Sequence, residues 1–293
     1  MSDLQSAIQQ VLNEIGIVGS FKLQTANGGD IHQAFTIETD TDKFFLKVNS
    51  SNHGQILASE FESLKKIAER FPDCYPAALV FQQYGDYALL LMQWLGLSPH
   101  NSHSARQLGI LLAEQHKTTH DQYGWFSDNF IGSTPQLNEW MNNWGEFFKT
   151  QRLIPQLELA ELNGADNSLL ALGEKLIAKL DDQLLPAEYQ PEISLLHGDL
   201  WSGNTARLAT GGAVLYDPAP YFGDRETDLA MTELFGRFPA EFYQAYQENY
   251  PLESTYQQRK ALYQLYHILN HFNLFGSGYQ NQAVRLIEYC LAS

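Results

Sequence analysis

An octapeptide between two short apolar runs constrains the fold of this chain more than any other feature. It covers His197–Asn204, reads HGDLWSGN and directly follows the apolar run Ile193–Leu196. A second apolar run, Ala213–Tyr216, lies further along and is followed at once by Asp217. Short apolar runs bounded by turn residues are typical of strands. The pattern therefore predicts two strands, with a polar loop after the first and a carboxylate after the second.

The polar side chains of this segment have the spacing of a kinase catalytic loop. That pattern is H-x-D-x-x-x-x-N, followed by a strand and a metal-binding Asp, and here it contains Asp199, Asn204 and Asp217. Phosphoryl transfer needs one carboxylate near the attacking hydroxyl, and further oxygen donors that hold Mg²⁺ against the phosphates. Taken alone, this spacing can also be an ordinary loop cap or turn. The second carboxylate, at the end of the next strand, favours a functional site.

A lysine and a glutamate in the first third of the chain support the same interpretation. Lys47 lies in the otherwise apolar run FFLKV, and Glu60 follows within a helical stripe of apolar residues. In kinases, a strand lysine and a helix glutamate position the α- and β-phosphates of ATP. Glu62 is the rival glutamate, but it falls on the polar side of the stripe. A lone lysine at a strand end is otherwise usually a solvated charge.

Two further segments are candidates for nucleotide contacts. Gly28 and Gly29 precede the first predicted strand and would let backbone amides approach phosphate oxygens, although Asn-Gly-Gly is also a common turn. The run Leu89–Gly96 fits a strand that leads into an interlobe hinge, where Gln93 and Leu95 could read adenine through their backbone groups. A plain core strand is the alternative. The chain contains neither a P-loop motif nor a Rossmann glycine motif.

The order of the predicted elements divides the chain into a small β-rich part and a larger helical part. In the first part, periodicity predicts helices over 4–15 and 55–70, and strands over 34–38, 43–48, 78–82 and 87–93. In the second part, it predicts helices over 104–119, 137–152, 169–180 and 280–291, and a helical block over 239–274 with an aromatic-rich helix over 256–275. We therefore expect an α+β, protein-kinase-like fold with a β-rich N-lobe over 1–93, a hinge over 94–98 and a mainly helical C-lobe over 99–293.

The acidic composition excludes several classes of partner. The formal net charge is −16 and the pI is near 4.8, so the chain would repel a nucleic-acid backbone and an anionic membrane surface. The two cysteines, Cys74 and Cys290, make neither a disulfide framework nor a metal-ligand set. No signal peptide and no apolar run long enough to span a bilayer is visible, so we expect a cytoplasmic protein.

Four segments of the sequence resemble the fructosamine kinase (ketosamine-3-kinase) family. Besides HGDLWSGN, they are DPAPYFGDRETDLAMTELFGRF at 217–238, WFSDNFIGSTPQLN at 125–138 and LYQLYHILNHFNLFGSGY at 262–279. The likeness extends from about the first predicted helix to the last. Such motifs are far more specific than the general kinase pattern.

The resemblance implies an ATP-dependent, Mg²⁺-dependent kinase that phosphorylates the 3-hydroxyl of ketosamines. Fructosamines and ribulosamines are examples, either free or bound to protein. By the same resemblance, Asp199 is the catalytic base, and Asn204 and Asp217 bind Mg²⁺. Lys47 with Glu60 then orients ATP.

Three positions bear on substrate and regulation. Trp201 stands where protein kinases have a lysine, two residues after the catalytic Asp, and its indole could either stack on a sugar-derived substrate or simply pack. Many family members have a Cys after the loop glycines and a His before the Arg-Glu pair, where this chain has Asp30 and Asp224. Asp30 argues against a redox switch at that loop position, and Asp224 leaves the substrate subclass open.

Two other functions stay open at this point. An aminoglycoside, choline or homoserine kinase would share the fold and the catalytic loop, and only the resemblance at 134–138 and 262–276 argues against it. A catalytically dead nucleotide-binding protein is less favoured, because every catalytic position is filled. His116 and His120, four residues apart on a predicted helix, could share a metal ion, but no further ligand completes the site and packing is favoured.

Overall fold

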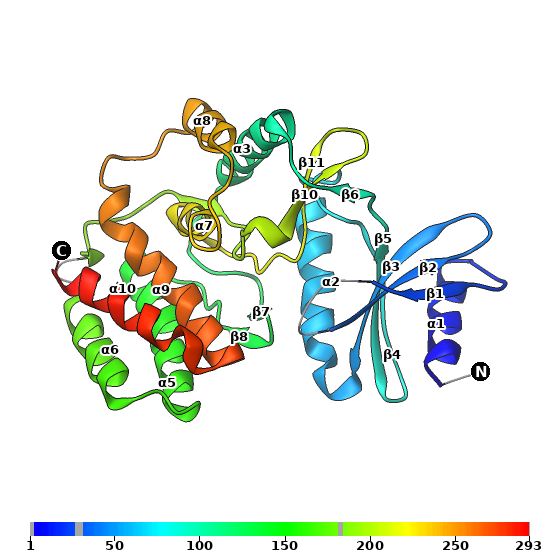
Figure 1. Cartoon of the computed structure of the whole chain (residues 1–293), viewed down its shortest axis with the longest axis horizontal. Helices are drawn as coiled ribbons and strands as arrows, with labels where there is room; N and C mark the ends of the chain where they lie inside the picture. The colour runs from blue at the N-terminus through cyan, green and yellow to red at the C-terminus, as the bar shows by residue number, and fades with distance from the viewer. Residues whose placement is uncertain (1–2, 27–31, 181–183, 293) are drawn as a thin grey trace. The chain divides into compact units, whose positions relative to one another are not determined.

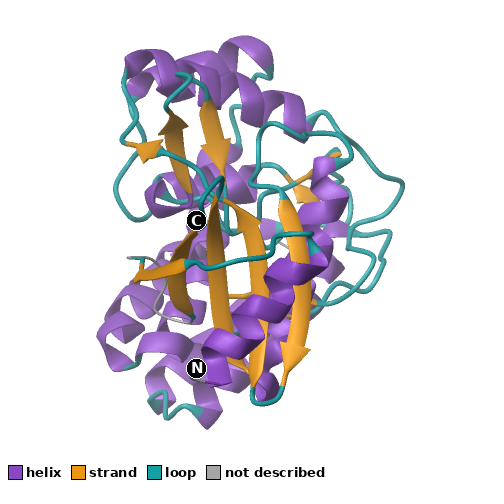
Figure 2. Cartoon of the chain, turned by 90° about the vertical axis from the view of Figure 1, so that its right-hand side faces the viewer, coloured by secondary structure: helices purple, strands orange, loops and turns teal. Residues whose placement is uncertain are grey.

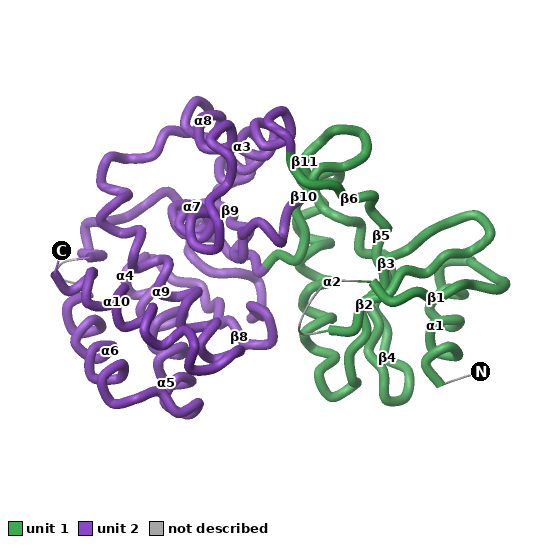
Figure 3. The backbone as a smooth tube through the Cα atoms, in the orientation of Figure 1, with its two compact units in different colours: residues 1–100, 206–218 green, residues 101–205, 219–293 purple. Residues whose placement is uncertain are grey.

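The computed structural model describes residues 3–26, 32–180 and 184–292. The chain forms two compact units, which Figure 3 shows in two colours. The first unit consists of residues 1–100 together with 206–218, and the second consists of residues 101–205 together with 219–293. Each unit is therefore assembled from two separate stretches of the sequence.

The first unit is built on a five-stranded antiparallel sheet with the strand order β1-β2-β3-β5-β4 (Figures 1 and 2). The strands are β1 (Lys22–Thr25), β2 (Gln33–Glu38), β3 (Lys43–Ser50), β4 (Ala78–Tyr84) and β5 (Tyr87–Gln93). Side chains along β3 alternate between the two faces of the sheet. Lys47 therefore lies on the opposite face from Leu46 and Val48.

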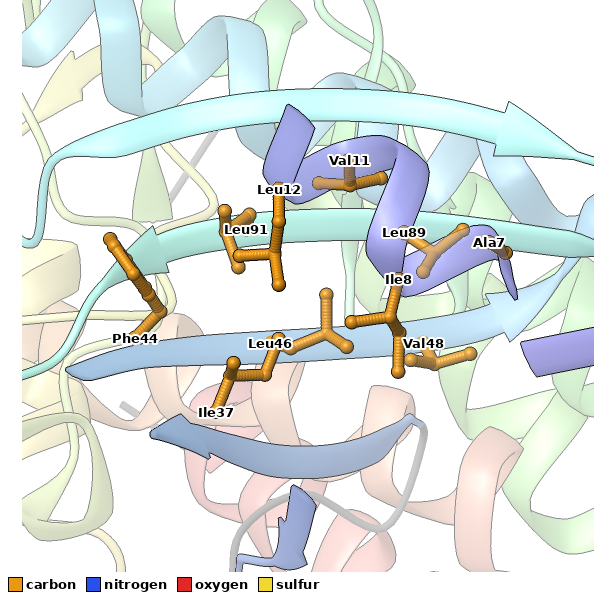
Figure 4. Packing of buried hydrophobic residues seen from close by; sticks show 10 residues of the cluster. All are labelled: Ala7, Ile8, Val11, Leu12, Ile37, Phe44, Leu46, Val48, Leu89 and Leu91. Atoms are coloured by element: carbon orange, nitrogen blue, oxygen red, sulfur yellow. The ribbon is translucent and has the colours of Figure 1, made fainter. Parts of the chain in front are cut away.

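Helix α1 (Asp3–Glu14) covers the face of the sheet that carries Leu46. Its buried residues include Ile8 and Leu12, which lie in one apolar cluster with Leu46 and Leu91 (Figure 4). Gly16 follows the helix with a φ of 79°, a left-handed conformation that glycine adopts without steric cost. A one-residue slip of β3 would turn its apolar side chains away from this cluster. The packing of α1 thus fixes which way Lys47 points.

Helix α2 (Gly54–Ala68) packs on the other side of β3, β4 and β5. It follows a 3-10 turn at Ser51–His53, and it buries Leu57 and Leu64. A smaller sheet with the order β11-β10-β6 completes this part of the chain. Its strands are β6 (Leu97–Ser98), β10 (Thr205–Leu208) and β11 (Ala213–Leu215).

The second unit is mainly helical (Figures 1 and 2). Its helices are α3 (Ser102–His116), α4 (Trp144–Phe148), α5 (Ile154–Leu162), α6 (Asn167–Lys179), α7 (Glu226–Thr232), α8 (Ala240–Asn249), α9 (Tyr256–Phe275) and α10 (Gln280–Ala292), with a π-helical turn at Lys149–Leu153 and 3-10 turns at Ser202–Asn204 and Ser277–Tyr279. Helix α9 contacts α5, α7 and α10. Two strand pairs add to the unit: β7 (Asn129–Ile131) with β8 (Thr134–Gln136), and β9 (Ile193–Leu195) with β12 (Phe222–Asp224).

One of the predicted helices differs from the observed ones. The helix predicted over 137–152 is wrong in its first half, because α4 begins only at Trp144, after Asn143 accepts a hydrogen bond from the backbone N–H of Glu146. The helical block predicted over 239–274 consists of α8 and α9, and the helix predicted over 256–275 is confirmed as α9. Pro251 lies between α8 and α9, and a residue before proline is disfavoured in helical conformation. Within the described ranges, no helix is long and apolar enough to cross a bilayer.

Candidate functional site

Three charged side chains meet in the first unit. The Nζ atom of Lys47 donates to Oε1 of Glu60 at 2.6 Å and to Oδ1 of Asp217 at 2.8 Å. Lys47 comes from β3, Glu60 from α2, and Asp217 from the segment after β11. The rival glutamate, Glu62, is exposed. The structure thus brings together a lysine and two carboxylates that are far apart in the sequence.

The electrostatics of this cluster keep Lys47 charged. Burial of its side chain alone would lower the pKa of Lys47, but the nearby carboxylates of Asp217 and Glu60 raise it above its usual value. The Asp217 side chain remains 44% exposed, so its second oxygen is accessible. Asp217 also has a φ of 55°, a left-handed conformation that among the described non-glycine residues occurs only here. Such backbone strain is typical of functional positions.

The octapeptide loop of the second unit holds Asp199 and Asn204 side by side. The Nδ2 group of Asn204 donates to the backbone carbonyl of Asp199 at 2.8 Å and to its carboxylate at 3.0 Å. Asn204 ends a 3-10 turn that begins at Ser202. These bonds use the amide nitrogen of Asn204 and leave its Oδ1 atom as an oxygen donor.

A buried carboxylate on α7 fixes the start of this loop. Asp228 accepts hydrogen bonds from the backbone N–H groups of His197 at 2.7 Å and Gly198 at 2.9 Å. Gly198 has a φ of 84°, and a Cβ atom there would lie 1.9 Å from the carbonyl oxygen of Ala219. Only glycine fits this position, because any side chain would force the backbone apart. The loop is therefore held by its backbone, upstream of Asp199.

His116 belongs to the support of this loop. Its Nδ1 lies 2.8 Å from the hydroxyl of Tyr246, and its Nε2 lies 3.1 Å from Oδ2 of Asp228. Burial lowers the pKa of His116, which favours the neutral ring, with Nε2–H donating to Asp228. Arg225 donates to the same Tyr246 hydroxyl at 3.1 Å. The sequence indicated only packing for His116, whereas the structure gives it a polar role.

His120 has no such connection to His116. It lies beyond the end of α3, and its ring stacks on Trp140 with centroids 4.3 Å apart. In the described part of the chain, no group of three or more His, Cys, Asp or Glu side chains is arranged to hold a metal ion. Both ring nitrogens of His116 have partners other than His120, namely Tyr246 and Asp228.

Trp201 lies within the octapeptide loop and remains 39% exposed. Its ring passes over Gly203, where a Cβ atom would lie 2.2 Å from the indole. The glycine therefore makes room for the indole to lie along the loop. A large aromatic face that is partly open to solvent can stack on a ligand.

Asp224 lies directly before the Arg-Glu pair at 225–226. It is 1% exposed, and its Oδ2 atom accepts hydrogen bonds from the hydroxyls of Tyr189 and Tyr263. Its Oδ1 atom accepts from the backbone N–H of Glu226 at 3.0 Å. Both oxygens thus have partners inside the second unit, and the buried carboxylate supports its structure.

The segment after β5 is irregular up to β6. Gln93 ends β5, and its backbone N–H donates to the carbonyl of Ala77 at 2.9 Å. Leu95 lies in the irregular segment before β6, and among the described residues its backbone groups form no hydrogen bond. Gly28 and Gly29 lie outside the described residues.

The sequence profile of the fructosamine kinase family matches residues 4–293, which is nearly the whole chain. The chain belongs to the fructosamine kinase family. It is 42% identical to a probable ketoamine kinase of Synechocystis sp., over 98% of this chain and 96% of that protein. It is also 37% identical to the chloroplastic protein-ribulosamine 3-kinase of Arabidopsis thaliana, over 91% of this chain and 82% of that protein.

Solved structures agree with this family membership. A Haemophilus somnus protein assigned as a fructosamine-3-kinase matches with a TM-score of 0.87 and 29% identity, over 97% of this chain and 96% of that one. The choline kinase LicA of Streptococcus pneumoniae matches with a TM-score of 0.65, 14% identity and full coverage of both chains, which shows a shared fold. The predicted family, the α+β kinase fold and the class of phosphotransferase are confirmed: this fructosamine kinase family member is a kinase.

Proposed function

We propose that this chain transfers the γ-phosphoryl group of ATP to the 3-hydroxyl of a ketosamine, such as a ribulosamine or fructosamine. The observation that carries the proposal is the contact of Lys47 with both Glu60 and Asp217, in a chain whose whole length matches the fructosamine kinase family. A buried, charged lysine between two carboxylates suits nucleotide phosphates, because one carboxylate positions it and the other remains available to a metal ion.

Asp199 is the catalytic base of this proposal. It would accept the proton of the attacking hydroxyl as the bond to the γ-phosphorus forms and the bond to the ADP oxygen breaks. The Asn204 amide donates to its carboxylate, which fixes the orientation of the carboxylate. Lys47 would balance the negative charge that spreads over the phosphates.

The donor set fits Mg²⁺, which prefers oxygen ligands and keeps several waters. Asn204 would supply Oδ1, because its Nδ2 is used by Asp199. Asp217 would supply Oδ2, because its Oδ1 accepts from Lys47. Bound there, Mg²⁺ would neutralise charge on the β- and γ-phosphates. The proposal requires these ligands, which belong to different units, to converge on one nucleotide.

We assign the parts of the chain as follows. Residues 1–93 form the N-lobe, 94–98 the hinge and 99–293 the C-lobe with the catalytic loop. Gly28 and Gly29 approach the phosphates, while the backbone of Gln93 and Leu95 contacts adenine. Leu95 supports the adenine contact, because its backbone groups form no hydrogen bond within the described part of the chain. Trp201 stacks on the sugar part of the acceptor, because its indole is partly exposed and it lies two residues after Asp199 in the same loop.

The physiological role that follows is repair of glycated amines, free or bound to protein, in the cytoplasm. A net charge of −16 supports a cationic lysine adduct as acceptor and argues against nucleic-acid or membrane partners. The relatives from plants are named chloroplastic, so the compartment differs between members of the family.

A coupled assay of ADP release with a panel of acceptors tests the proposal. Ribulosyl-lysine and fructosyl-lysine should be phosphorylated, with the phosphate on the 3-hydroxyl by NMR, and turnover should stop without Mg²⁺. Kanamycin, choline and homoserine should give no signal above the background. If the enzyme phosphorylates only kanamycin, choline or homoserine, that compound and not a ketosamine is its acceptor. Nucleotide binding without turnover on any acceptor would indicate a protein that has lost catalysis.

A further inference from the structure

A histidine that no sequence motif singled out lies beside Lys47. The β2–β3 register pairs Gln33 with Val48 and Ala34 with Lys47, so one step further along both strands His32 lies opposite Asn49. Lys47 and Asn49 are two residues apart on β3 and share a face of the sheet. His32 therefore lies on the face of Lys47, away from the apolar cluster that packs under α1.

Hydrogen bonds determine which nitrogen of His32 carries its proton. The Oδ1 atom of Asn49 accepts from the backbone N–H of Ser50 at 2.8 Å, which leaves the Nδ2 group of Asn49 facing the ring. That amide lies 2.9 Å from Nδ1 of His32 and can only donate. Nδ1 is thus an acceptor, and the proton of a neutral ring must be on Nε2.

The surroundings of His32 keep it neutral. Partial burial of the ring, followed by the positive charge of Lys47, lowers the pKa of His32 to about 4. The negative charge of Asp217 acts on the pKa of His32 in the opposite direction but is outweighed. Among the described residues, Nε2–H has no hydrogen-bond acceptor. A fixed, neutral donor without an acceptor suits a ligand that brings its own oxygens.

The geometry points to His32 as a nucleotide-binding residue whose Nε2–H donates to a phosphate oxygen of ATP next to Lys47. This assignment rests on the proposed function, because it takes the face of Lys47 as the phosphate side of the sheet. Asn49 acts through His32 as a positioning residue, since its amide fixes the donor on Nε2. A neutral donor there adds a directed contact without a second positive charge beside Lys47.

Substitutions that retain either the donor role of Nε2 or the acceptor role of Nδ1 test the assignment. The side-chain amide of His32→Gln can replace the Nε2 donor, whereas His32→Asn can replace only the acceptor that Asn49 contacts. Binding of a non-hydrolysable ATP analogue should weaken by about tenfold in His32→Asn and His32→Ala, a typical loss for one hydrogen bond to a charged group. His32→Gln should stay within about threefold of the wild type. Adenosine, which lacks phosphates, should bind all four proteins alike.

Three results would overturn the assignment. The first is wild-type affinity for the ATP analogue in His32→Ala. The second is the reverse order, with His32→Asn like the wild type and His32→Gln like His32→Ala, because a structural role needs only the bond to Asn49. The third is an equal loss of adenosine binding. The binding assay needs no acceptor. If the wild type binds the ATP analogue but phosphorylates no ketosamine, only the proposed function is contradicted. A wild type that binds no nucleotide would sink both.

Discussion

The two units hold their candidate functional side chains in different ways. In the first unit the groups contact one another directly, since Lys47 binds both Glu60 and Asp217. In the second unit the loop that carries Asp199 is held through its backbone by Asp228, which is 1% exposed. Substitutions in the first unit should therefore act through the nucleotide and its metal ion, whereas the second unit should also depend on a residue that never meets the substrate.

The largest effect is expected for the base of the second unit. Asp199→Asn should lower kcat by at least about 100-fold, the usual contribution of a positioned general base, with the KM for ATP little changed. The coupled ADP-release assay measures it. Asp121→Asn, which changes an exposed carboxylate near the end of α3, is the matched control and should behave as the wild type. Wild-type turnover in Asp199→Asn would show that Asp199 is not the catalytic base.

A loss of similar size but different kind is expected in the first unit. Asp217→Asn removes a negative charge that binds Lys47, and it should lower kcat by at least about 100-fold while raising the Mg²⁺ concentration needed for half-maximal rate. A titration of Mg²⁺ in the same assay separates this substitution from Asp199→Asn, whose Mg²⁺ requirement should change less. Equal Mg²⁺ curves for the wild type and Asp217→Asn would contradict the metal assignment.

The third prediction tests the backbone support directly. Asp228→Asn replaces the acceptor of two backbone N–H groups with a weaker one and should lower kcat by about 10- to 100-fold. The free energy of unfolding should fall by about 2 kcal/mol, since hydrogen bonds to a buried charge are lost. Affinity for an ATP analogue should hold. A variant that loses stability but keeps its kcat would show that the loop does not need this support.

A smaller effect is expected at the indole of the loop. Trp201→Ala should raise the KM for the ketosamine by about tenfold, because stacking on the sugar part is lost, and should leave the KM for ATP unchanged. Trp201→Phe keeps an aromatic face and should recover part of the loss. If both KM values stay at the wild-type level in Trp201→Ala, the indole only packs against Gly203.

The smallest effect concerns a buried histidine on α9. Burial lowers the pKa of His267 to about 3, well below the ordinary value of 6.5. Between these two pKa values His267 is protonated in the unfolded chain but neutral in the folded chain. The free energy of unfolding therefore falls as the pH drops below about 6.5. Between pH 7.5 and 5.5 this group should cost about 1 kcal/mol of unfolding free energy. Denaturant unfolding of the wild type and His267→Gln should show that difference in pH slope, and parallel slopes would contradict it.

The first unit was the easier one to predict from sequence. Lys47, Glu60 and Asp217 each lie in a segment whose periodicity is strong, namely a strand, a helix and a strand end. The kinase pattern predicts a strand lysine, a helix glutamate and an Asp at a strand end. Identifying the strand or helix that carries each residue was therefore enough to predict the three candidates. Strand β1 was missed, since most of its side chains are exposed and no apolar alternation marks it.

The second unit depends on contacts that local patterns do not contain. His116 and Asp228 lie 112 residues apart, and nothing near His116 distinguishes it from a packed histidine. The irregular segment after β8 was mistaken for a helix because its apolar residues have helical spacing. Its backbone is held instead by distant side chains: Asp128 accepts from the backbone N–H of Asn138, and Arg152 donates to the carbonyl of Leu137. Long-range polar partners override local propensity there.

The division of the chain at 206–218 limits how this protein can be dissected. A fragment ending at His100 would lack β10, β11 and Asp217, so Lys47 would keep only one of its two carboxylates. β6 would also lose its neighbouring strand. An isolated first unit would have to carry residues 206–218 grafted after residue 100. Simple truncation at residue 100 would remove the Asp217 carboxylate that binds Lys47.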